Sequence, residues 1–344
     1  MKIIVDAMGG DFAPDVVIEG TIAAIKQYGV EVGLVGDEKR IRQLLADARF
    51  DSSLLTVHHA DEVVEMHESP AASVRRKRNS SIAVGLRMVK EGGGDAFFSA
   101  GNTGAAVCAA TLTLGLLPGI ERPGIGTVLP TLKGNALILD VGANIDPKPE
   151  HLLQYGIMGS AYATHILGKS KPTVGLLNVG EEDSKGTGIL KEAFELLSKT
   201  HLNFIGNIEG KHIYQGDCDV IVCDGFVGNV TLKVSESLGE ALQQFLKRHI
   251  MGSPLGILAG FLLMPSLKKF KKEIDYSEYG GAPLLGVNGV VIIGHGRSNA
   301  KAIKNAIRVA KTEVEHRFNE KIIEALNADK GVVPAASPVK STIC

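Results

Sequence analysis

Short apolar runs and longer helical patterns alternate along almost the whole chain. Several runs are hydrophobic at consecutive positions, which is typical of strands buried on both faces of a sheet. The predicted strands are residues 2–7, 31–35, 55–59, 96–99, 126–129, 136–141, 173–179, 203–208, 220–223 and 290–293. The main predicted helices are residues 14–28, 80–91, 103–114, 149–167, 186–198, 229–249 and 298–326. Such alternation produces right-handed βαβ units, so the sequence predicts an α/β fold with a largely parallel sheet.

The 344 residues contain no repeat of fixed period, and the alternation is clearly interrupted in one segment. We expect residues 1–330 to form a single domain. Residues 249–281 fit neither a strand nor a polar loop, because an apolar stretch at 255–264 precedes the basic sequence KKFKK. We interpret this segment as an excursion from the sheet. Residues 331–344 have no periodicity and are expected to be a disordered tail.

The net charge of the chain limits its expected partners, and its N-terminal residues indicate its cellular compartment. The chain has 37 Lys and Arg against 38 Asp and Glu, a net charge of −1, so any attraction to nucleic acid or an anionic membrane must be local. Asp6 follows only three apolar residues, too few for a secretory signal, which predicts a cytoplasmic protein. No apolar run reaches the roughly 20 residues of a spanning helix, although the 255–264 stretch can lie on a membrane surface.

The chain contains 41 glycines, and many of them directly follow predicted strands. Glycine-bearing loops occupy this position at residues 6–11, 99–104, 140–144, 178–186, 224–229 and 294–299. Ligands of doubly wound sheets bind outside the carboxyl ends of the strands. Glycine allows the backbone to approach a ligand there, and each following helix offers N–H groups to an anion. We expect the six loops to meet in one anion-binding cleft.

Familiar motifs of nucleotide and hydrolytic chemistry are absent from the sequence. The fingerprint GxGxxG does not occur, and GNIEGKH at 206–212 departs from a Walker loop in its glycine spacing and in having His212. Neither HExxH nor GxSxG is present. Nucleotide hydrolases, zinc peptidases and serine hydrolases are therefore not expected.

Six motifs resemble those of the bacterial phosphate acyltransferase (PlsX) family, in unbroken order over about residues 1–330. They are DAMGGD at 6–11, SAGNTGA at 99–105, LDVGAN at 139–144, NVGEEDSKG at 178–186, DGFVGN at 224–229 and GGAPLLG at 280–286. The resemblance implies conversion of fatty acyl-[acyl carrier protein] and inorganic phosphate to acyl phosphate, for phospholipid synthesis. It also implies a homodimeric three-layer α/β/α fold, like that of phosphotransacetylases and isopropylmalate dehydrogenases, with no metal or organic cofactor. In such a fold, residues 249–281 would be an inserted helical hairpin.

This chemistry requires groups that hold phosphate and stabilise the oxyanion. Phosphate is the nucleophile, and a thiol with a pKa near ~8.5 leaves readily, so an activated Ser or Cys is unnecessary. Lys185, in a glycine-flanked loop, is the first candidate for pairing with phosphate or the oxyanion; the alternative is a solvated loop lysine. Asn229 and Asn102 can donate side-chain N–H groups to phosphate or to the oxyanion. The alternative for both is that they only cap helices.

Three further titratable residues have two interpretations each. Asp6 and Asp224, at strand ends, can orient Lys185 or accept a proton, or else bind loop backbone. His295 is a candidate general base or a turn residue between two glycines. The remaining candidates for substrate and phosphate binding are Gly9, Gly10, Gly101, Thr103, Asn144 and Gly228.

The densest basic run is a candidate contact for acyl carrier protein, a strongly acidic partner. It consists of Arg75, Arg76, Lys77 and Arg78. Its alternative is a solvated charge run, and no aromatic residues are interleaved as a nucleic-acid site would require. Nucleic acid is therefore not an expected partner.

The apolar stretch at 255–264 has the composition of an interfacial anchor, because lysines that suit anionic head groups follow it. Its candidate membrane contacts are Leu255, Leu258, Phe261 and Leu262. The alternative is a helical hairpin buried at a dimer interface. The first interpretation predicts peripheral membrane association of a cytoplasmic protein.

Two other functions remain open from the residues. A decarboxylating dehydrogenase on the same fold would bind NAD and a divalent metal, and the only clustered acids are Asp217, Asp219 and Asp224. A non-catalytic sensor of acyl carrier protein is the second alternative, although six glycine-bearing loops favour an enzyme.

Overall fold

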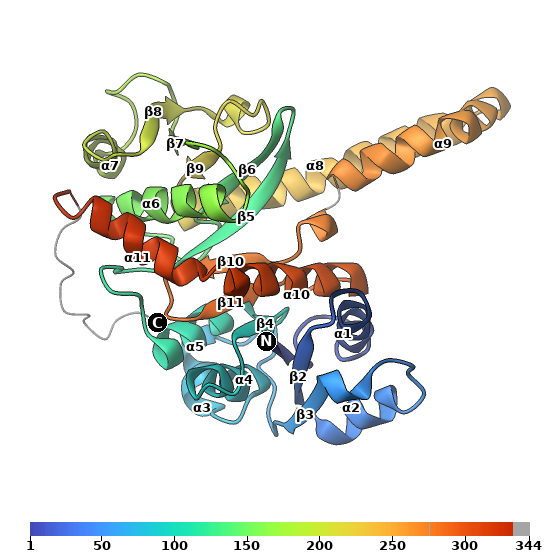
Figure 1. The fold of residues 1–344 in the computed structure, drawn as a ribbon. Coiled ribbons are helices and arrows are strands. Elements are labelled where there is room, and N and C mark those ends of the chain that lie inside the picture. The colour runs from blue at the N-terminus through green and yellow to red at the C-terminus, as the bar shows by residue number, and fades with distance from the viewer. Residues whose placement is uncertain (275, 333–344) are drawn as a thin grey trace.

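The computed structural model describes residues 1–274 and 276–332, without the side chains of Phe261 and residues 271–276. The described residues form an eleven-stranded sheet with the order β3-β2-β1-β4-β11-β10-β5-β6-β9-β7-β8 (Figure 1). The strands are β1 (Lys2–Asp6), β2 (Glu31–Gly36), β3 (Leu55–His59), β4 (Ala96–Ser99), β5 (Gly124–Thr131), β6 (Gly134–Leu139), β7 (Thr173–Leu177), β8 (Asn203–Ile208), β9 (Val220–Val222), β10 (Ala282–Leu285) and β11 (Val290–Ile293).

Helices cover both faces of this sheet. They are α1 (Asp15–Tyr28), α2 (Glu38–Leu45), α3 (Pro70–Arg76), α4 (Ser81–Lys90), α5 (Thr103–Leu114), α6 (Pro149–His165), α7 (Gly188–Leu197), α8 (Gly225–Met251), α9 (Pro254–Ile274), α10 (Ala300–Glu315) and α11 (Phe318–Ala328), with short 3-10 helices at Ser52–Leu54, Gly210–His212 and Tyr276–Glu278. Along β1, Ile3 and Val5 pack in the core beneath α1 and α10, whereas Ile4 packs in the core beneath α4 and α5. The three-layer α/β/α prediction is confirmed.

The two halves of the sheet run in opposite directions. Strands β1 to β4 and β11 are mutually parallel, and so are β6 to β9, but β10 and β5 join the two groups through three successive antiparallel pairings. The predicted loops at residues 6–11, 99–104 and 294–299 therefore follow strands of one direction, and the other three follow strands of the opposite direction. The six loops therefore do not all follow strands of one direction, as they would in a fully parallel sheet.

Several element boundaries differ from the sequence predictions for local reasons. The predicted helix 298–326 is two helices, because Arg317 adopts a left-handed conformation with φ of 48° between them. The four-residue strand β10 was not predicted, since Pro283 and the preceding Gly280 and Gly281 are typical of a turn. Helix α8 begins at Gly225, so most of the motif DGFVGN is its first turn.

Helices α8 and α9 form the predicted helical hairpin, which projects from the body of the molecule (Figure 1). The excursion begins inside α8, before the predicted residue 249, because α8 continues for 27 residues without a break. Among the described residues, no helix combines the length and apolar character that crossing a membrane requires. Most of the tail predicted at 331–344 lies outside the described residues.

Candidate active site

The first turn of α8 packs directly on the loop that follows β6. Gly225 N donates to Asn144 O at 2.9 Å, and the Asp224 side chain caps the helix by accepting Val227 N at 2.8 Å. A Cβ at Gly228 would lie 1.8 Å from Asp140 O, so only glycine allows this contact. Gly228 therefore serves the packing of helix against loop, and Asp224 acts as the helix cap.

The buried Asp140 organises the loop after β6. Its carboxylate accepts backbone N–H groups from Ile125 (2.9 Å), Gly142 (3.1 Å), Ala143 (3.0 Å) and Asn144 (2.7 Å). Burial raises the pKa of Asp140 to about 6, against the opposing effect of these hydrogen bonds. In this loop, one of the six expected to bind an anion, the backbone N–H groups are thus donated to a carboxylate of the chain itself.

Asn229 and Asn144 face different surroundings at this loop. The Asn144 amide lies 3.3 Å from His151 Nδ1 and 3.4 Å from Tyr155 Oη, which turns it toward α6. Asn229 is exposed, and its Nδ2 lies 3.1 Å from the point where a Gly142 Cβ would be. No side-chain hydrogen bond of Asn229 occurs among the described residues, so its amide is available to a ligand.

One turn further along α8, Lys233 crosses to the other half of the sheet. Lys233 Nζ lies 2.8 Å from His295 Nε2, in the loop after β11, and 2.8 Å from Glu236 Oε2. His295 Nδ1 accepts Arg297 N at 3.1 Å. Burial first, and then the Lys233 charge, hold the pKa of His295 below its usual value. Residues four apart on a helix are neighbours, so α8 brings the loops after β6 and β11 to one place.

Sequence reasoning found Asn229 and His295 but missed Lys233 and Glu236. The signal that identifies them is the i, i+4 spacing of Asn229 and Lys233, which becomes visible once the helix is known to start at Gly225. Asp140 was also missed, although it lies within the motif LDVGAN.

Loops after β1 and β4 pack tightly against each other at the end of the sheet that also carries the His295 loop. Asp6 is buried and accepts Ser99 Oγ at 2.7 Å and Met8 N at 3.0 Å. Burial raises the pKa of Asp6 above its usual value. A Cβ at Gly9 would lie 2.6 Å from both Asp6 Oδ2 and Gly101 N. In this structure neither Asp6 nor Asp224 contacts Lys185, so the predicted orienting role is wrong.

Gly10 connects this pair of loops to the loop after β11. It has φ of +108°, and the following Asp11 N donates to Gly296 O at 2.8 Å. Met66 also reaches this point, with its Cε 2.8 Å from where a Gly296 Cβ would be. The segment that contains Met66 therefore covers the loop of His295.

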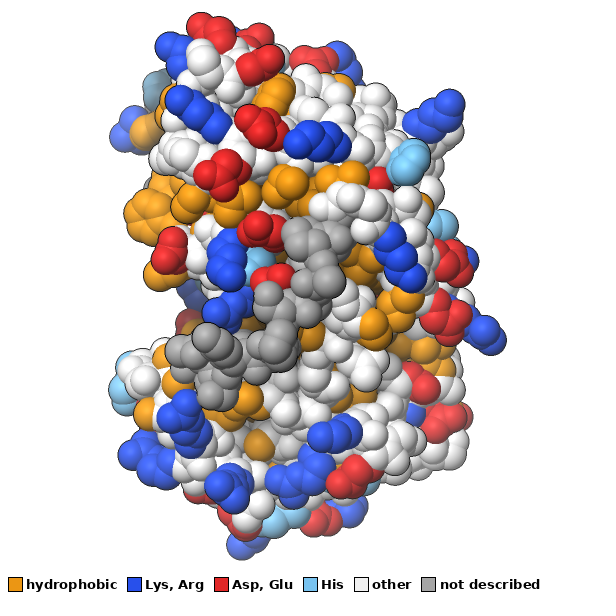
Figure 2. Space-filling view, turned by 90° about the vertical axis from the view of Figure 1, so that its left-hand side faces the viewer, with side chains coloured by type: hydrophobic (Ala, Val, Ile, Leu, Met, Phe, Trp, Pro, Cys, Tyr) orange, Lys and Arg blue, Asp and Glu red, His pale blue; other side chains and the backbone are white. Residues whose placement is uncertain are grey.

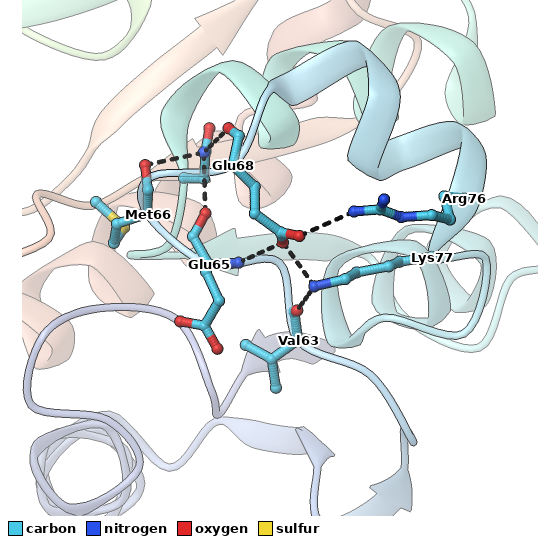
Figure 3. Close-up of polar contacts among 7 residues, drawn as sticks. Val63, Glu65, Met66, Glu68, Arg76 and Lys77 are labelled. Atoms are coloured by element: carbon cyan, nitrogen blue, oxygen red, sulfur yellow. Dashed lines mark hydrogen bonds and ion pairs between the residues drawn. The ribbon is translucent and has the colours of Figure 1, made fainter.

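Asn102 fixes that covering segment. It caps α5 by accepting Ala105 N at 3.0 Å, while its Nδ2 lies within 3.0–3.2 Å of three backbone oxygens. Those oxygens belong to Glu65, Met66 and Glu68 (Figure 3). The Asn102 amide is thus committed to the chain itself, whereas the adjacent Thr103, at the first position of α5, is exposed.

Lys185 lies in a loop whose backbone is fixed by polar contacts with neighbouring side chains. Asn178 Nδ2 donates to Lys185 O at 3.2 Å and to Asn207 Oδ1 at 3.1 Å, and Glu181 pairs with Lys211 at 2.9 Å. The Lys185 side chain is exposed, and its Nζ has no polar partner among the described residues. A fixed backbone with an uncommitted ammonium group suits an anionic ligand.

The basic run divides into two pairs. Arg76 and Lys77 bind Glu68, at 3.1 and 2.6 Å, and Lys77 also donates to Val63 O at 2.6 Å (Figure 3). These contacts hold the covering segment. Arg75 and Arg78 are exposed, and no side-chain partner of either occurs in the described part of the chain. Figure 2 shows a face on which basic and acidic side chains are interspersed, as the net charge near zero leads one to expect.

The candidate membrane residues on α9 are largely exposed. Leu255, Leu258 and Leu262 are 76%, 60% and 77% exposed, and the side chain of Phe261 lies outside the described residues. The apolar surface of α9 is therefore uncovered in the isolated chain.

The three aspartates that the dehydrogenase alternative would need for a metal do not converge. Asp217 pairs with Lys133, Asp219 pairs with Lys169 at 3.0 Å, and Asp224 caps α8. Each carboxylate thus has a structural partner of its own.

Solved structures with the same fold include phosphate-handling enzymes. A phosphotransacetylase from Streptococcus pyogenes superposes with a TM-score of 0.63 at 19% identity, over 92% of this chain and 94% of that one. A 4-hydroxythreonine-4-phosphate dehydrogenase from Klebsiella pneumoniae superposes with a TM-score of 0.51 at 14% identity, over 91% of this chain and 99% of that one. These similarities define the fold class, a phosphotransacetylase-like α/β/α fold.

Sequence relatives define the family. A family model described as fatty acid synthesis protein matches residues 1–321. The phosphate acyltransferase of Desulfitobacterium hafniense is 54% identical over 327 residues, covering 95% of this chain and 98% of that protein. That of Aquifex aeolicus is 50% identical over 324 residues, covering 94% and 96%. The chain belongs to the phosphate acyltransferase family of fatty acid and phospholipid synthesis, and the dehydrogenase and sensor alternatives are excluded.

Proposed function

We propose that the enzyme transfers a fatty acyl group from the thioester of acyl carrier protein to inorganic phosphate. A phosphate oxygen attacks the thioester carbonyl carbon and forms a tetrahedral oxyanion. The carbon–sulfur bond then breaks, the sulfur keeps the electron pair, and acyl phosphate is released with free carrier thiol. A thiolate is a good leaving group, so the enzyme mainly has to position the reactants and stabilise negative charge.

The observation that carries this proposal is the meeting of Asn229, Lys233 and His295 on one side of α8. Lys233 supplies positive charge, and Asn229 supplies an uncommitted amide for phosphate or the oxyanion. Burial and the Lys233 charge lower the pKa of His295, which favours the neutral ring, the form that can act as a general base. Lys185, whose ammonium group has no polar partner among the described residues, pairs with phosphate or the oxyanion.

Contact with the carrier is assigned to Arg75 and Arg78. Both are exposed, in contrast to Lys77, which is largely buried against Glu68. Opposite charge across an interface mainly accelerates association and fixes orientation. Arg76 and Lys77 support this surface by holding the covering segment in place.

The hairpin is assigned to peripheral membrane contact, and the enzyme to a homodimer. Exposed leucines on α9, followed by Lys268 and Lys269, match an interfacial helix that inserts apolar residues among anionic head groups. Acyl phosphate is itself amphipathic, so its release beside a membrane is chemically reasonable.

The test is incubation of the protein with hexadecanoyl-[acyl carrier protein] and phosphate. We expect hydroxylamine-trappable acyl phosphate and free carrier thiol in equal amounts, and neither without phosphate. Thiol release that is independent of phosphate would identify a thioesterase and contradict the proposal.

A further inference from the structure

The loop that carries Lys185 has little apolar packing to hold it. It connects β7 with α7, and β7 pairs with the edge strand β8 (Figure 1). Residues 181–185 of this loop are all exposed. A loop with few buried side chains keeps a fixed shape only where polar contacts hold its backbone. The position of the Lys185 ammonium group therefore depends on the hydrogen bonds that the loop backbone makes.

Both backbone groups of Lys185 are hydrogen-bonded. Its N–H donates to Glu182 O at 3.0 Å, and its carbonyl oxygen accepts Asn178 Nδ2 at 3.2 Å. Asn207, buried on β8, reaches both of these partners. Asn207 Nδ2 donates to Glu182 O at 3.0 Å, and Asn207 Oδ1 accepts Asn178 Nδ2 at 3.1 Å. One side-chain amide thus supports the N–H and the carbonyl group of Lys185, through one intermediate residue on each side.

The hydrogen-bonding capacity of the two amides permits only one orientation of Asn207. Asn178 gives one N–H to Lys185 O and the other to Asn207 Oδ1. Its own Oδ1 accepts Val179 N at 2.8 Å. A flipped Asn207 would turn its Nδ2 toward Asn178 Nδ2 and its Oδ1 toward Glu182 O, so both contacts would become repulsive. Both amides are buried, where an unpaired polar group is costly.

A further contact between the loop and the segment after β8 is exposed to solvent. Lys211 pairs with Glu181 at 2.9 Å, and the two side chains are 54% and 55% exposed. Exposed ion pairs of this kind contribute little. The buried amides therefore hold the loop, and the sequence GNIEGKH at 206–212 acts on it mainly through its asparagine.

We propose that Asn207 is a positioning residue for acyl transfer, because it fixes the backbone of Lys185 and thereby limits where the ammonium group can meet phosphate or the oxyanion. The inference rests on the proposed function and adds what holds Lys185 in place. Asn207 acts through Lys185 and does not itself contact the substrate, since it is 6% exposed and both ends of its amide are bound to the chain.

The test is a double-mutant cycle of Asn207→Asp with Lys185→Ala, and the matched control is Asn203→Asp. Asn203 lies on the same strand, but its Nδ2 donates to Lys171 O, at 3.3 Å, in a different loop. We expect Asn207→Asp to lower kcat/KM for phosphate about tenfold or more in the wild-type background, but less than about twofold when residue 185 is alanine. The control should stay within about twofold in both backgrounds.

A pH profile separates positioning from a general loss of structure. The carboxylate of the Asn207→Asp variant would face Glu182 O without a proton to donate, whereas the protonated carboxyl group restores that hydrogen bond. Burial beside a carbonyl oxygen raises the pKa of a carboxyl group. We therefore expect Asn207→Asp to regain activity relative to the wild type as pH falls from about 8 to 6, and Asn203→Asp to show no such recovery.

Equal losses in both backgrounds, or full activity of Asn207→Asp, would overturn the assignment. Hydrogen exchange adds a readout without turnover, because the Lys185 amide should exchange faster in Asn207→Asp than in the wild type and the control; unchanged protection would refute the proposal. If Asn207→Asp does not fold, Asn207→Ser takes its place in the cycle and in the exchange measurement. Wild-type turnover of Lys185→Ala would refute this inference together with the role of Lys185, whereas a wild type that forms no acyl phosphate would refute the proposed function itself.

Discussion

Replacing Gly228 by alanine tests whether α8 and the loop after β6 form one rigid unit. The added Cβ would lie 1.8 Å from Asp140 O and 2.9 Å from Cys223 Sγ, whereas ordinary contacts begin near 3.4 Å. The helix and the loop therefore have to separate by roughly 1.6 Å. Overpacking of this kind typically costs about 1–3 kcal/mol of stability.

The same displacement moves Asn229 and Lys233, because they lie on the first turns of the helix that shifts. A misplacement of about 1 Å can cost about a hundredfold in rate, so we expect Gly228→Ala to lower kcat/KM by at least that factor. Acyl phosphate formation and urea denaturation measure the two effects. The matched control is Gly239→Ala on the same helix, where an added Cβ meets nothing within 4 Å.

Gly239→Ala is expected to keep full activity and to gain up to about 1 kcal/mol from helix propensity. If Gly228→Ala instead retained near wild-type activity and stability, the close contact between α8 and the Asp140 carbonyl would not hold the site. The argument that α8 positions Asn229 and Lys233 would then be refuted.

Four other changes test separate parts of the molecule. Lys185→Ala should lower kcat by about 10²–10³, with unfolding free energy within about 0.5 kcal/mol of wild type, because its side chain is exposed; near-full turnover at saturating carrier would refute its role. Arg75→Glu combined with Arg78→Glu should raise KM for the carrier and weaken its salt dependence, and unchanged kinetics at low ionic strength would contradict this. Leu258→Glu should abolish flotation with anionic vesicles while the dimer persists, whereas the control Leu132→Glu, at an exposed leucine outside the hairpin, should not; a monomer would place the helix at the subunit interface. Burial raises the pKa of Glu313 to about 8, so the unfolded state ionises first and stability should fall as pH rises from about 4.5 to 8; Glu313→Gln should remove that slope in urea melts, and an unchanged slope would assign it to other groups.

Much of the fold could be predicted from the sequence because its strands are buried on both faces. The bounds of β4, β11 and α5 coincide with the predicted ones, since apolar runs end abruptly at polar or glycine residues there. The reversal of strand direction between the two halves of the sheet could not be predicted from the sequence. It depends on β10, a four-residue strand, and a short apolar run carries no signal of the direction of its neighbours.

The candidate site could be predicted from the sequence only in part. Glycine-bearing motifs identified the loops, but the purpose of the glycines differs from the prediction at Gly9 and Gly228, where they allow close packing. Lys233 was hidden because its importance comes from His295, 62 residues away in the sequence and 2.8 Å away in space. Only the crossing of α8 between the two halves brings them together.

That crossing also explains why one helix can serve several parts of the proposed reaction. Since the strands of the two halves point in opposite directions, their polar loops do not all lie along one edge, and the first turns of α8 connect the loop after β6 with the loop of His295. Helix α8 does so with its first three turns and then continues, without a break, into the projecting hairpin. Positioning of Asn229 and Lys233 and the start of the projecting hairpin follow from the same 27-residue helix.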